Sequence, residues 1–337
     1  MSKKTLAQEY IPSDEASTIQ DLANRLKEKV IQDNPTGIMR RDAHPKMHGV
    51  VKAEFTVEAN LPAELRVGVF AVPKIFQAWI RFSNAAGTRG PDANKDFRGM
   101  AIKLMGVDGA KILEDELDET TQDFLLINAN MFLTRDAREF DLFVKAMTGS
   151  LWAKACFFLP RPSLIWKLLT LMSPCANPLQ VRYWSTTPFL FGNAAVKYSA
   201  IPHVAVADTV PVNPDADFLR QAMVRQLGLG AAVFDFAVQL QTDADAMPIE
   251  DASVAWSEDA SPFRKVATIR ILQQEFDGEA QRVFGENLSF TPWHSLAVHR
   301  PLGGINRARK VVYRTISMFR HARNGVARKE PTSWDIS

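Results

Sequence analysis

The stretch AWIRFSNAAG, residues 78–87, is rich in apolar and aromatic side chains and ends at Asn84 and Gly87. Both features are typical of a short β-strand followed by a turn. Three similar segments lie nearby, namely HGVVKAEFTV (48–57), FRGMAIKLMGV (97–107) and QDFLLINANMF (122–132), and two alternating runs follow later, VFDFAVQLQT (233–242) and KVATIRILQQEF (265–276). Because little helical sequence separates the early strands, an antiparallel sheet or barrel fits better than a parallel sheet.

A helix precedes these strands. Residues 13–34 open with Ser13, a typical N-cap residue, and then repeat apolar side chains at helical spacing, at Ile19, Leu22, Leu26 and Val30. We therefore expect an α+β fold with an antiparallel β-barrel core and helices packed around it. Its expected parts are an N-terminal helix and arm (1–38), the barrel domain (39–325) and a C-terminal tail (326–337).

Composition limits the function. The chain has 337 residues, 46% of them hydrophobic, and a net charge of +2, which argues against a nucleic-acid binder. Its two cysteines, Cys156 and Cys175, have no metal-ligand spacing and cannot form a disulfide framework, so a reducing compartment is the simpler expectation. The N-terminus lacks an apolar signal segment and no run of about 18 apolar residues occurs, which predicts a cytoplasmic protein without a transmembrane segment.

One apolar segment, SLWAKACFFLPRPSLIWKLLTLMSP (150–174), contains two tryptophans and is interrupted by Pro160 and Pro162. It is too interrupted to span a bilayer. One interpretation is a helical hairpin packed on the core. The other is an interfacial element that makes peripheral contact with a membrane or with an apolar substrate.

The stretch RRDAHPKMHG (40–49) places His44 and His48 four residues apart. On a helix, this spacing would put both on one face as zinc ligands. The strand-like run that follows argues against a helix, and no Glu lies between the two histidines. From the local sequence alone, a structural role is the more common one for such histidines.

The stretch INRARKVVYRTISMFRHARN (305–324) is helix-like and surrounds one tyrosine, Tyr313, with six cations. Arg309 lies four residues before Tyr313, so both side chains lie on one helical face. A nearby guanidinium favours the phenolate form of a tyrosine over the neutral phenol.

Six stretches, taken in order, resemble successive segments of the haem catalases and especially their short catalase-related relatives. They are RRDAHPK (40–46), IRFSNAAGTRG (80–90), DFRGMAIKLM (96–105), DFLLINANMFLTRDAREF (123–140), FDFAVQLQTDADAMPIEDASVAW (234–256) and LSFTPWHSLAVHRPLGGINRARKVVY (288–313). The resemblance implies haem b as cofactor, with Tyr313 as the iron ligand and Arg309 completing an R-x-x-x-Y motif. A tyrosinate ligand stabilises oxidised iron.

The resemblance also implies site residues on the other face of the haem. His44 would be the general base, and Ser83, 39 residues later, would fix its tautomer. Asn128 would orient the peroxide, with Asn130 as the alternative amide.

Further residues would hold the haem itself. Arg41, Arg81 and Arg320 match arginines that bind the haem propionates, and bidentate arginine–carboxylate pairing suits that role. Phe140 matches an aromatic residue that stacks on the haem. Arg314, Lys310 and Arg323 fit a solvated basic helix instead.

The implied activity is that of a haem peroxidase of the catalase-related type, which decomposes hydrogen peroxide or organic hydroperoxides with an unidentified electron donor. The alternatives are an enzyme that transforms fatty-acid hydroperoxides, similar to allene oxide synthases, and a non-catalytic haem-binding or redox-sensing protein. Ala43 precedes the histidine, where allene oxide synthases have a Thr that hydrogen-bonds it. Ala43 leaves His44 free as a base, which favours peroxide decomposition. Self-association stays open.

Overall fold

The computed structural model describes residues 4–336 of the chain. Its strands are β1 (Met47–Val57), β2 (Ile75–Asn84), β3 (Arg98–Met105), β4 (Thr121–Ile127), β5 (Tyr183–Trp184), β6 (Phe189–Phe191), β7 (Ala194–Pro202), β8 (Ala232–Leu240) and β9 (Arg264–Ile271). They pair antiparallel in the order β5-β4-β3-β2-β1-β9-β8-β7-β6. Two residue pairs between β5 and β7 close eight of these strands into a barrel, with β6 attached to β7. The predicted α+β fold with an antiparallel barrel is confirmed.

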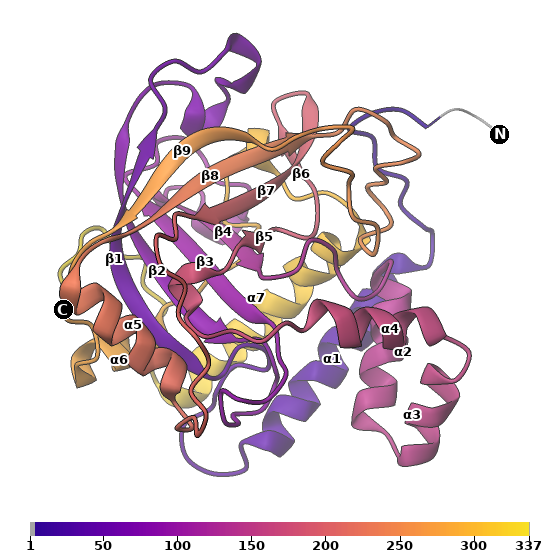
Figure 1. Cartoon of the computed structure of the whole chain (residues 1–337). Coiled ribbons are helices and arrows are strands. Elements are labelled where there is room, and N and C mark those ends of the chain that lie inside the picture. Colours follow the sequence, from indigo (N-terminus) through magenta and orange to yellow (C-terminus); the bar gives the residue numbers. More distant parts are fainter. Residues whose placement is uncertain (1–3, 337) are drawn as a thin grey trace.

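Helices surround the barrel (Figure 1). They are α1 (Glu15–Asp33), α2 (Ala137–Thr148), α3 (Leu151–Phe158), α4 (Pro162–Leu171), α5 (Phe218–Leu229), α6 (Glu279–Asn287) and α7 (Gly304–Asn324). Short 3-10 helices occupy Ala63–Leu65, Gly68–Phe70, Glu114–Glu116, Pro178–Gln180 and Ala297–His299. No helix within residues 4–336 is both long and apolar enough to span a membrane.

The inside of the barrel is filled by aromatic rings. Phe124 lies at the centre of this packing, with ring centroids 5.0 Å from Phe236 and 5.0 Å from Tyr198. Phe55 adds a further contact, 5.1 Å from Phe236. Large aromatic side chains bury the most apolar surface per residue, so they account for much of the barrel's stability. The functional residues must therefore lie at an edge of the barrel or outside it.

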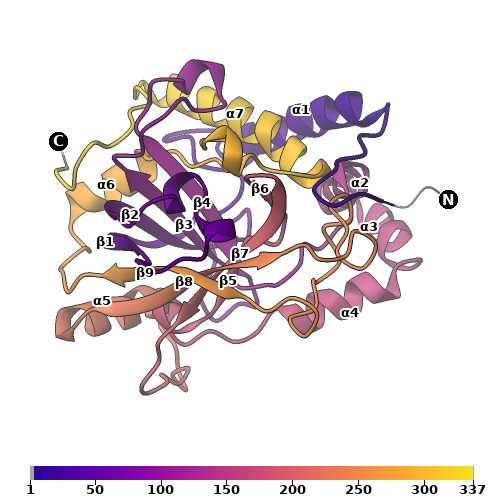
Figure 2. The same cartoon turned by 90° about the horizontal axis from the view of Figure 1, so that it is seen from above.

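Helices α1 and α7 lie side by side outside the barrel (Figure 2). The apolar residues predicted to face the core from α1 are buried against α7 and α2, namely Ile19, Leu22, Leu26 and Val30. The prediction of Ser13 as the N-cap is wrong. Asp14 holds that position, and its side chain makes no capping hydrogen bond. Asp14 lies in the helical backbone region and its carbonyl accepts from Thr18, so the chain begins to coil one residue later than the sequence suggests.

The apolar segment 150–174 forms the helical hairpin that one interpretation predicted, with α3 and α4 joined at Leu159–Arg161. Phe157 and Leu164 turn inward and pack with Ala146 of α2. Ser150 caps α3 by accepting a hydrogen bond from the Ala153 backbone N–H at 3.2 Å. The hairpin therefore has a small core of its own, built on α2 and separate from the barrel.

One edge of the barrel gathers the chain segments that carry polar residues. Strand β1 begins there, β2 ends there with Asn84, β3 begins there with Arg98, and β4 ends there with Ile127. The register pairs Ser83 with Gly99 and Gly99 with Ile127. Antiparallel pairing thus places residues from four distant parts of the sequence within a few ångströms of each other.

Candidate active site

His44 lies just before β1, at this edge of the barrel. Its Nδ1 atom is 3.0 Å from the Oγ atom of Ser83, and its backbone carbonyl accepts a hydrogen bond from Arg81 at 2.9 Å. The φ angle of His44 is +61°, a left-handed conformation that non-glycine residues adopt rarely. Such conformations persist where the surrounding structure enforces them, and they cluster at functional sites.

The His44 ring lies directly over Gly99 of β3. A Cβ atom at position 99 would lie 2.6 Å from two ring atoms of His44 and 3.0 Å from Ser83 Oγ. No real Cβ atom is tolerated at such a distance, so only glycine lets the imidazole occupy this position. The sequence analysis did not single out Gly99, because its role depends on a contact with a residue 55 positions away.

The charge state of His44 is set by its surroundings. Burial lowers the pKa of His44 to about 3, and the charges of Arg81, Arg309 and Arg41 lower it further in the same direction. The imidazole is therefore neutral at physiological pH. A neutral imidazole can accept a proton, as a general base must.

His48 belongs to a different environment. It is buried in β1, and its Nε2 atom lies 2.8 Å from Asn84 Oδ1. Asn84 in turn donates to Asp92, and Arg98 donates to the same Asn84 oxygen. His48 is thus tied into a buried polar network, which separates it from the hydroxyl group that contacts His44.

Asn128 follows β4 and lies beside Gly99. Its Oδ1 atom accepts a hydrogen bond from the Arg98 backbone N–H at 2.6 Å, and its own N–H donates to the Arg98 carbonyl at 3.0 Å. Within residues 4–336, the amide NH₂ group of Asn128 has no hydrogen-bond partner and so is available as a donor. Asn130 is exposed and lines a separate hollow of about 240 Å³ with Trp184 and Lys197. The structure therefore brings Asn128, and not Asn130, to the edge that carries His44.

Arg309 and Tyr313 form a pair on α7. Arg309 Nε donates to the Tyr313 hydroxyl at 3.3 Å, and its guanidinium carbon lies 5.2 Å from the Tyr313 ring centroid. The Arg309 guanidinium also makes a second hydrogen bond, since its Nη1 atom donates to Asn306 Oδ1 at 3.2 Å. Asn306 is fully buried and also accepts from Thr187 at 3.1 Å. Asn306 was missed in the sequence, although a buried amide near the start of a basic helix is a signal for such a role.

The β1 edge and α7 face the same space. The charge of Arg309 on α7 helps to lower the pKa of His44, while Tyr313 on α7 acts on the pKa of Arg41, which lies three residues before His44. Such interactions weaken rapidly with distance, so helix α7 and the segment before β1 lie close together and form two walls of the candidate site.

Three guanidinium groups converge next to this site. Arg81 and Arg320 are buried, and Arg41 is partly buried. Arg41 donates to the backbone carbonyls of Glu286, at 2.9 Å, and Leu288, and Arg320 donates to the Glu286 carbonyl at 2.6 Å. Burial and the charge of Arg41 lower the pKa of Arg320 to about 9, and the same two causes lower the pKa of Arg81 well below its ordinary value. This region therefore holds more positive charge than the Glu286 carboxylate balances.

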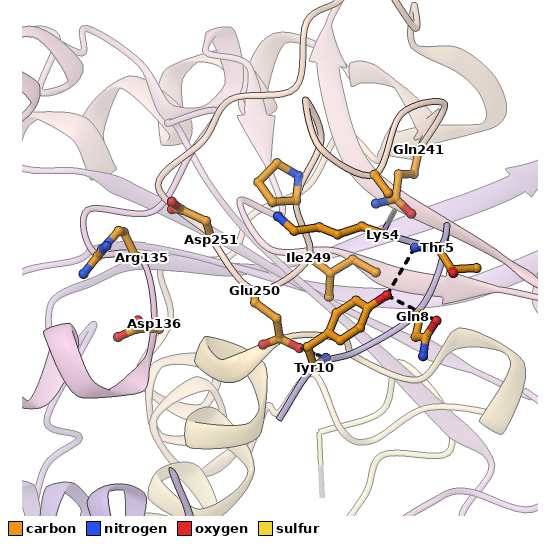
Figure 3. A pocket seen from close by; sticks show the side chains of 12 residues that line it. Lys4, Thr5, Gln8, Tyr10, Arg135, Asp136, Gln241, Ile249, Glu250 and Asp251 are labelled. Carbon is orange, nitrogen blue, oxygen red and sulfur yellow. Dashed lines mark hydrogen bonds between the residues drawn. The ribbon is translucent and has the colours of Figure 1, made fainter. Parts of the chain in front are cut away.

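Phe140 of α2 lies in the apolar cluster that also contains Tyr313. Its ring centroid is 5.4 Å from Phe132 and 6.3 Å from Phe143. Of the other cations of α7, Arg314 pairs with Asp115 at 3.5 Å, and the Lys310 amine lies 4.8 Å from the Trp293 ring centroid. A second hollow, of about 340 Å³, lies between the N-terminal arm and the loops around Arg135 and Glu250 (Figure 3). None of the predicted site residues lines it.

The sequence was compared with models of known protein families to find the family of this chain. The family model described as Catalase matches residues 4–180. The chain belongs to the catalase family. No curated protein sequence matches it.

Solved catalase structures have the same fold. A fungal catalase superposes with a TM-score of 0.69 at 16% identity, over 95% of this chain and 66% of that one. Catalase A from Saccharomyces cerevisiae gives 0.69 at 17% identity, over 95% and 68%. A bacterial catalase gives 0.64 at 17% identity, over 96% and 63%. This catalase-family chain thus spans about two thirds of the length of these relatives.

Catalase-family proteins bind haem, and the residues of this chain can be tested against that cofactor. Within residues 4–336, the buried Nε atoms of Arg41 and Arg81 lack a hydrogen-bond partner. Unpaired buried donors are costly, and a haem carries two propionate groups that would accept from them. The Tyr313 hydroxyl on α7 is an oxygen donor of a kind that ligates haem iron in catalases. The residues present therefore fit a haem.

Proposed function

We propose that this chain is a haem-dependent peroxidase of the catalase-related type that decomposes hydrogen peroxide or organic hydroperoxides. The observation that carries the proposal is the arrangement of the two walls of the site. One wall holds His44, whose Nδ1 atom lies 3.0 Å from Ser83 Oγ, and helix α7 nearby holds the arginine–tyrosine pair. A base opposite an anionic oxygen ligand is the arrangement that peroxide cleavage at a haem needs.

In this proposal Tyr313 ligates the iron of haem b, and Arg309 holds the Tyr313 oxygen through its hydrogen bond at 3.3 Å. Arg41, Arg81 and Arg320 bind the propionates. Phe140 packs against the ring system from the apolar cluster that it shares with Tyr313. Haem, when bound, supplies the redox-active iron at which the O–O bond of a peroxide breaks.

The protein residues handle the proton. His44 accepts a proton from one peroxide oxygen through Nε2 and returns it to the departing oxygen. Ser83 holds Nδ1 and so fixes which nitrogen faces the peroxide. The free NH₂ group of Asn128 orients the substrate. General acid–base groups of this kind typically contribute ~10²–10⁴-fold in rate.

The test is a comparison of haem-loaded His44→Ala and His48→Ala variants. His44→Ala should retain haem and lose about 10²–10⁴-fold of the peroxide-decomposing rate. His48→Ala should keep its rate per haem, because His48 belongs to the Asn84–Arg98 network. Equal losses in both variants would contradict the proposed role of His44.

A second candidate function is the transformation of fatty-acid hydroperoxides. It is favoured by a continuous series of aromatic rings that runs from Phe140 at the site to the apolar hairpin. Phe143 lies 6.3 Å from Phe140 and 6.0 Å from Phe157 of α3, measured between ring centroids. Assays with hydrogen peroxide and with a fatty-acid hydroperoxide distinguish the two. Oxygen release from the first supports catalase-type activity, and consumption of the second alone supports the lipid substrate.

A further inference from the structure

The hairpin formed by α3 and α4 exposes an unusual amount of apolar surface. In Figure 1 it lies beside α2, away from the barrel. The exposed fractions of its large apolar side chains are 84% for Leu151, 76% for Trp152, 77% for Leu159, 67% for Trp166 and 61% for Leu169. The surfaces of soluble proteins rarely expose so many large apolar side chains on one short element. Such a patch usually marks a site of interaction.

The hairpin is apolar on two sides. Its inner side is satisfied by Phe157 and Leu164, which pack against α2. Trp152 of α3 and Leu159, which directly follows α3, are exposed on the outer side, and Trp166 and Leu169 lie three residues apart and exposed on α4. Helices that are apolar on more than the core-facing stripe are typical of elements that contact a second apolar phase.

The charged side chains of the hairpin itself have one sign. From Leu142 to Ala207 the sequence contains no Asp or Glu, although the whole chain contains 38 of them. Lys154 of α3 and Arg138 of the adjoining α2 form no side-chain hydrogen bond or ion pair with any residue between 4 and 336. Arg161 and Lys167 are turned back toward the body, to Glu139 at 3.6 Å and to the Ser253 carbonyl at 3.0 Å. The free charges beside the apolar face are therefore positive.

This combination matches an anionic bilayer better than another protein chain of the same kind. A two-fold dimer through this face would place the same cations opposite each other, which costs free energy. A bilayer surface with anionic headgroups offers both the apolar phase and the complementary charge. Tryptophan is enriched at that depth of a membrane, where its ring is buried and its N–H group stays near water.

The length of the helices fixes the mode of contact. With 8 residues in α3 and 10 in α4, they extend roughly 12 Å and 15 Å at 1.5 Å per residue, far less than a bilayer core of about 30 Å. The hairpin can therefore insert its outer face into the headgroup region but cannot cross the membrane.

We propose that the outer face of the α3–α4 hairpin docks the protein on anionic phospholipid bilayers, with Trp152, Leu159 and Trp166 inserted and Lys154 and Arg138 against the headgroups. This docking does not depend on haem or on the proposed peroxidase activity.

The test is sedimentation of the full chain with vesicles of phosphatidylcholine alone and of phosphatidylcholine mixed with phosphatidylglycerol. We expect binding to the anionic vesicles that weakens as salt is raised. Trp152→Ser combined with Trp166→Ser should weaken binding at least about tenfold. The matched control is Val206→Ser combined with Val212→Ser, since these valines are 80% and 96% exposed outside the hairpin. Lys154→Glu should weaken binding more than Lys95→Glu, an exposed cation in another loop.

Three results would overturn the proposal. One is a lack of binding to either vesicle composition. Another is equal binding by the tryptophan variant and the wild type. The third is a wild-type dimer that the tryptophan substitutions dissociate without any effect on vesicle binding, which would show that a second copy covers the face. Because the substituted side chains are exposed, circular dichroism and melting temperature should be unchanged and serve as the folding control.

Discussion

The Nδ1 atom of His44 lies 3.0 Å from the Oγ atom of Ser83, although 39 residues separate them in the sequence. The contact exists because β1 and β2 pair antiparallel, so the chain before β1 meets the end of β2. It fixes the orientation of a ring that burial and three arginines keep neutral. Several expected outcomes depend on this geometry.

Gly99→Ala should displace the His44 ring. The added Cβ would lie 2.6 Å from two of its atoms, so the imidazole must move away from Ser83. We expect the peroxide rate per haem to fall by about 10²-fold or more, with haem content unchanged. Gly228→Ala is the matched control, because no atom lies within 4 Å of its added Cβ and its φ is not positive. A fully active Gly99→Ala enzyme would show that the ring position does not matter.

The pH dependence of the rate should reflect the lowered pKa of His44. An unperturbed histidine loses its basic form as pH falls through about 6.5. The pKa of His44 is lowered to about 3, so its neutral form persists far below that value. We therefore expect kcat/KM for peroxide to be flat from about pH 8 down to about pH 5. A loss of half the activity near pH 6.5 would indicate an ordinary histidine at this position.

The lowered pKa of His44 should also make the stability of the fold depend on pH. Because the folded pKa of His44 is depressed below its unfolded value, the unfolded chain binds more protons at acid pH. This group therefore contributes stability that is present above about pH 6.5 and declines as pH falls toward about 3. Unfolding by denaturant at several pH values should show a smaller acid loss in His44→Gln than in the wild type. An identical pH dependence in both proteins would contradict the shift.

Retention of haem should depend on the buried arginines. Arg320→Leu removes a charge-assisted partner of a propionate, an interaction worth about 1.5–3 kcal/mol. We expect haem transfer to an acceptor protein such as apomyoglobin to accelerate roughly 10- to 100-fold. Arg314→Leu on the same helix should have little effect, because Arg314 is exposed and pairs only with Asp115 at 3.5 Å. Equal transfer rates in the two variants would argue against a propionate site at Arg320.

The C-terminal segment should be fastened to the barrel by a buried ion cluster. Lys103 of β3 lies 2.6 Å from Asp123 and 2.6 Å from Glu330, and all three side chains are buried. Lys103→Met would remove the cation nearest to both carboxylates and leave Glu330 with Arg328 at 3.6 Å, so the free energy of unfolding should fall by about 3–5 kcal/mol. Lys265→Met removes pairs that are partly exposed and should cost less than about 1 kcal/mol. A similar loss in both variants would contradict the role of burial.

The sequence indicated the barrel because most of its long strands can be recognised from the pattern of their own residues. The segments 48–57 and 78–87 combine apolar side chains with terminal Gly or Asn, and they became β1 and β2. Strands β5 and β6 were missed because they have 2 and 3 residues, too few for any periodicity. The nine-residue β7 was missed as well, because its sequence contains three alanines and a proline, which have low strand propensity. Helix α6 was missed because it contains Gly285. That glycine lies where the helix packs on β1, and a Cβ there would lie 2.6 Å from Met47 Sδ, so the Met47 side chain would have to shift.

Some residues of the candidate site can also be identified from a local pattern, whereas others depend on contacts between distant segments. Arg309 and Tyr313 could be paired from their spacing on one helix, which is a local property. His44 and Ser83 could be paired only through resemblance to a family. Gly99 and Glu286 could not be found, because their roles arise from contacts between distant segments that no local pattern encodes. Asn306 was overlooked, although it lies three residues before Arg309 on the same helix. The roles of the site residues stay predictions until variants are measured.

Haem binding through Tyr313 is tested most directly by the haem content and absorption spectrum of the full chain. The chain is purified for this after expression with ample haem. We expect about one haem per chain with a ferric tyrosinate spectrum in the wild type. The same result is expected for Tyr10→Phe, the control substitution at an exposed tyrosine. In Tyr313→Phe, haem should be lost or its spectrum changed, because the oxygen ligand is gone. A wild-type protein that binds no haem, or a Tyr313→Phe variant with unchanged haem content and spectrum, would contradict haem binding through Tyr313.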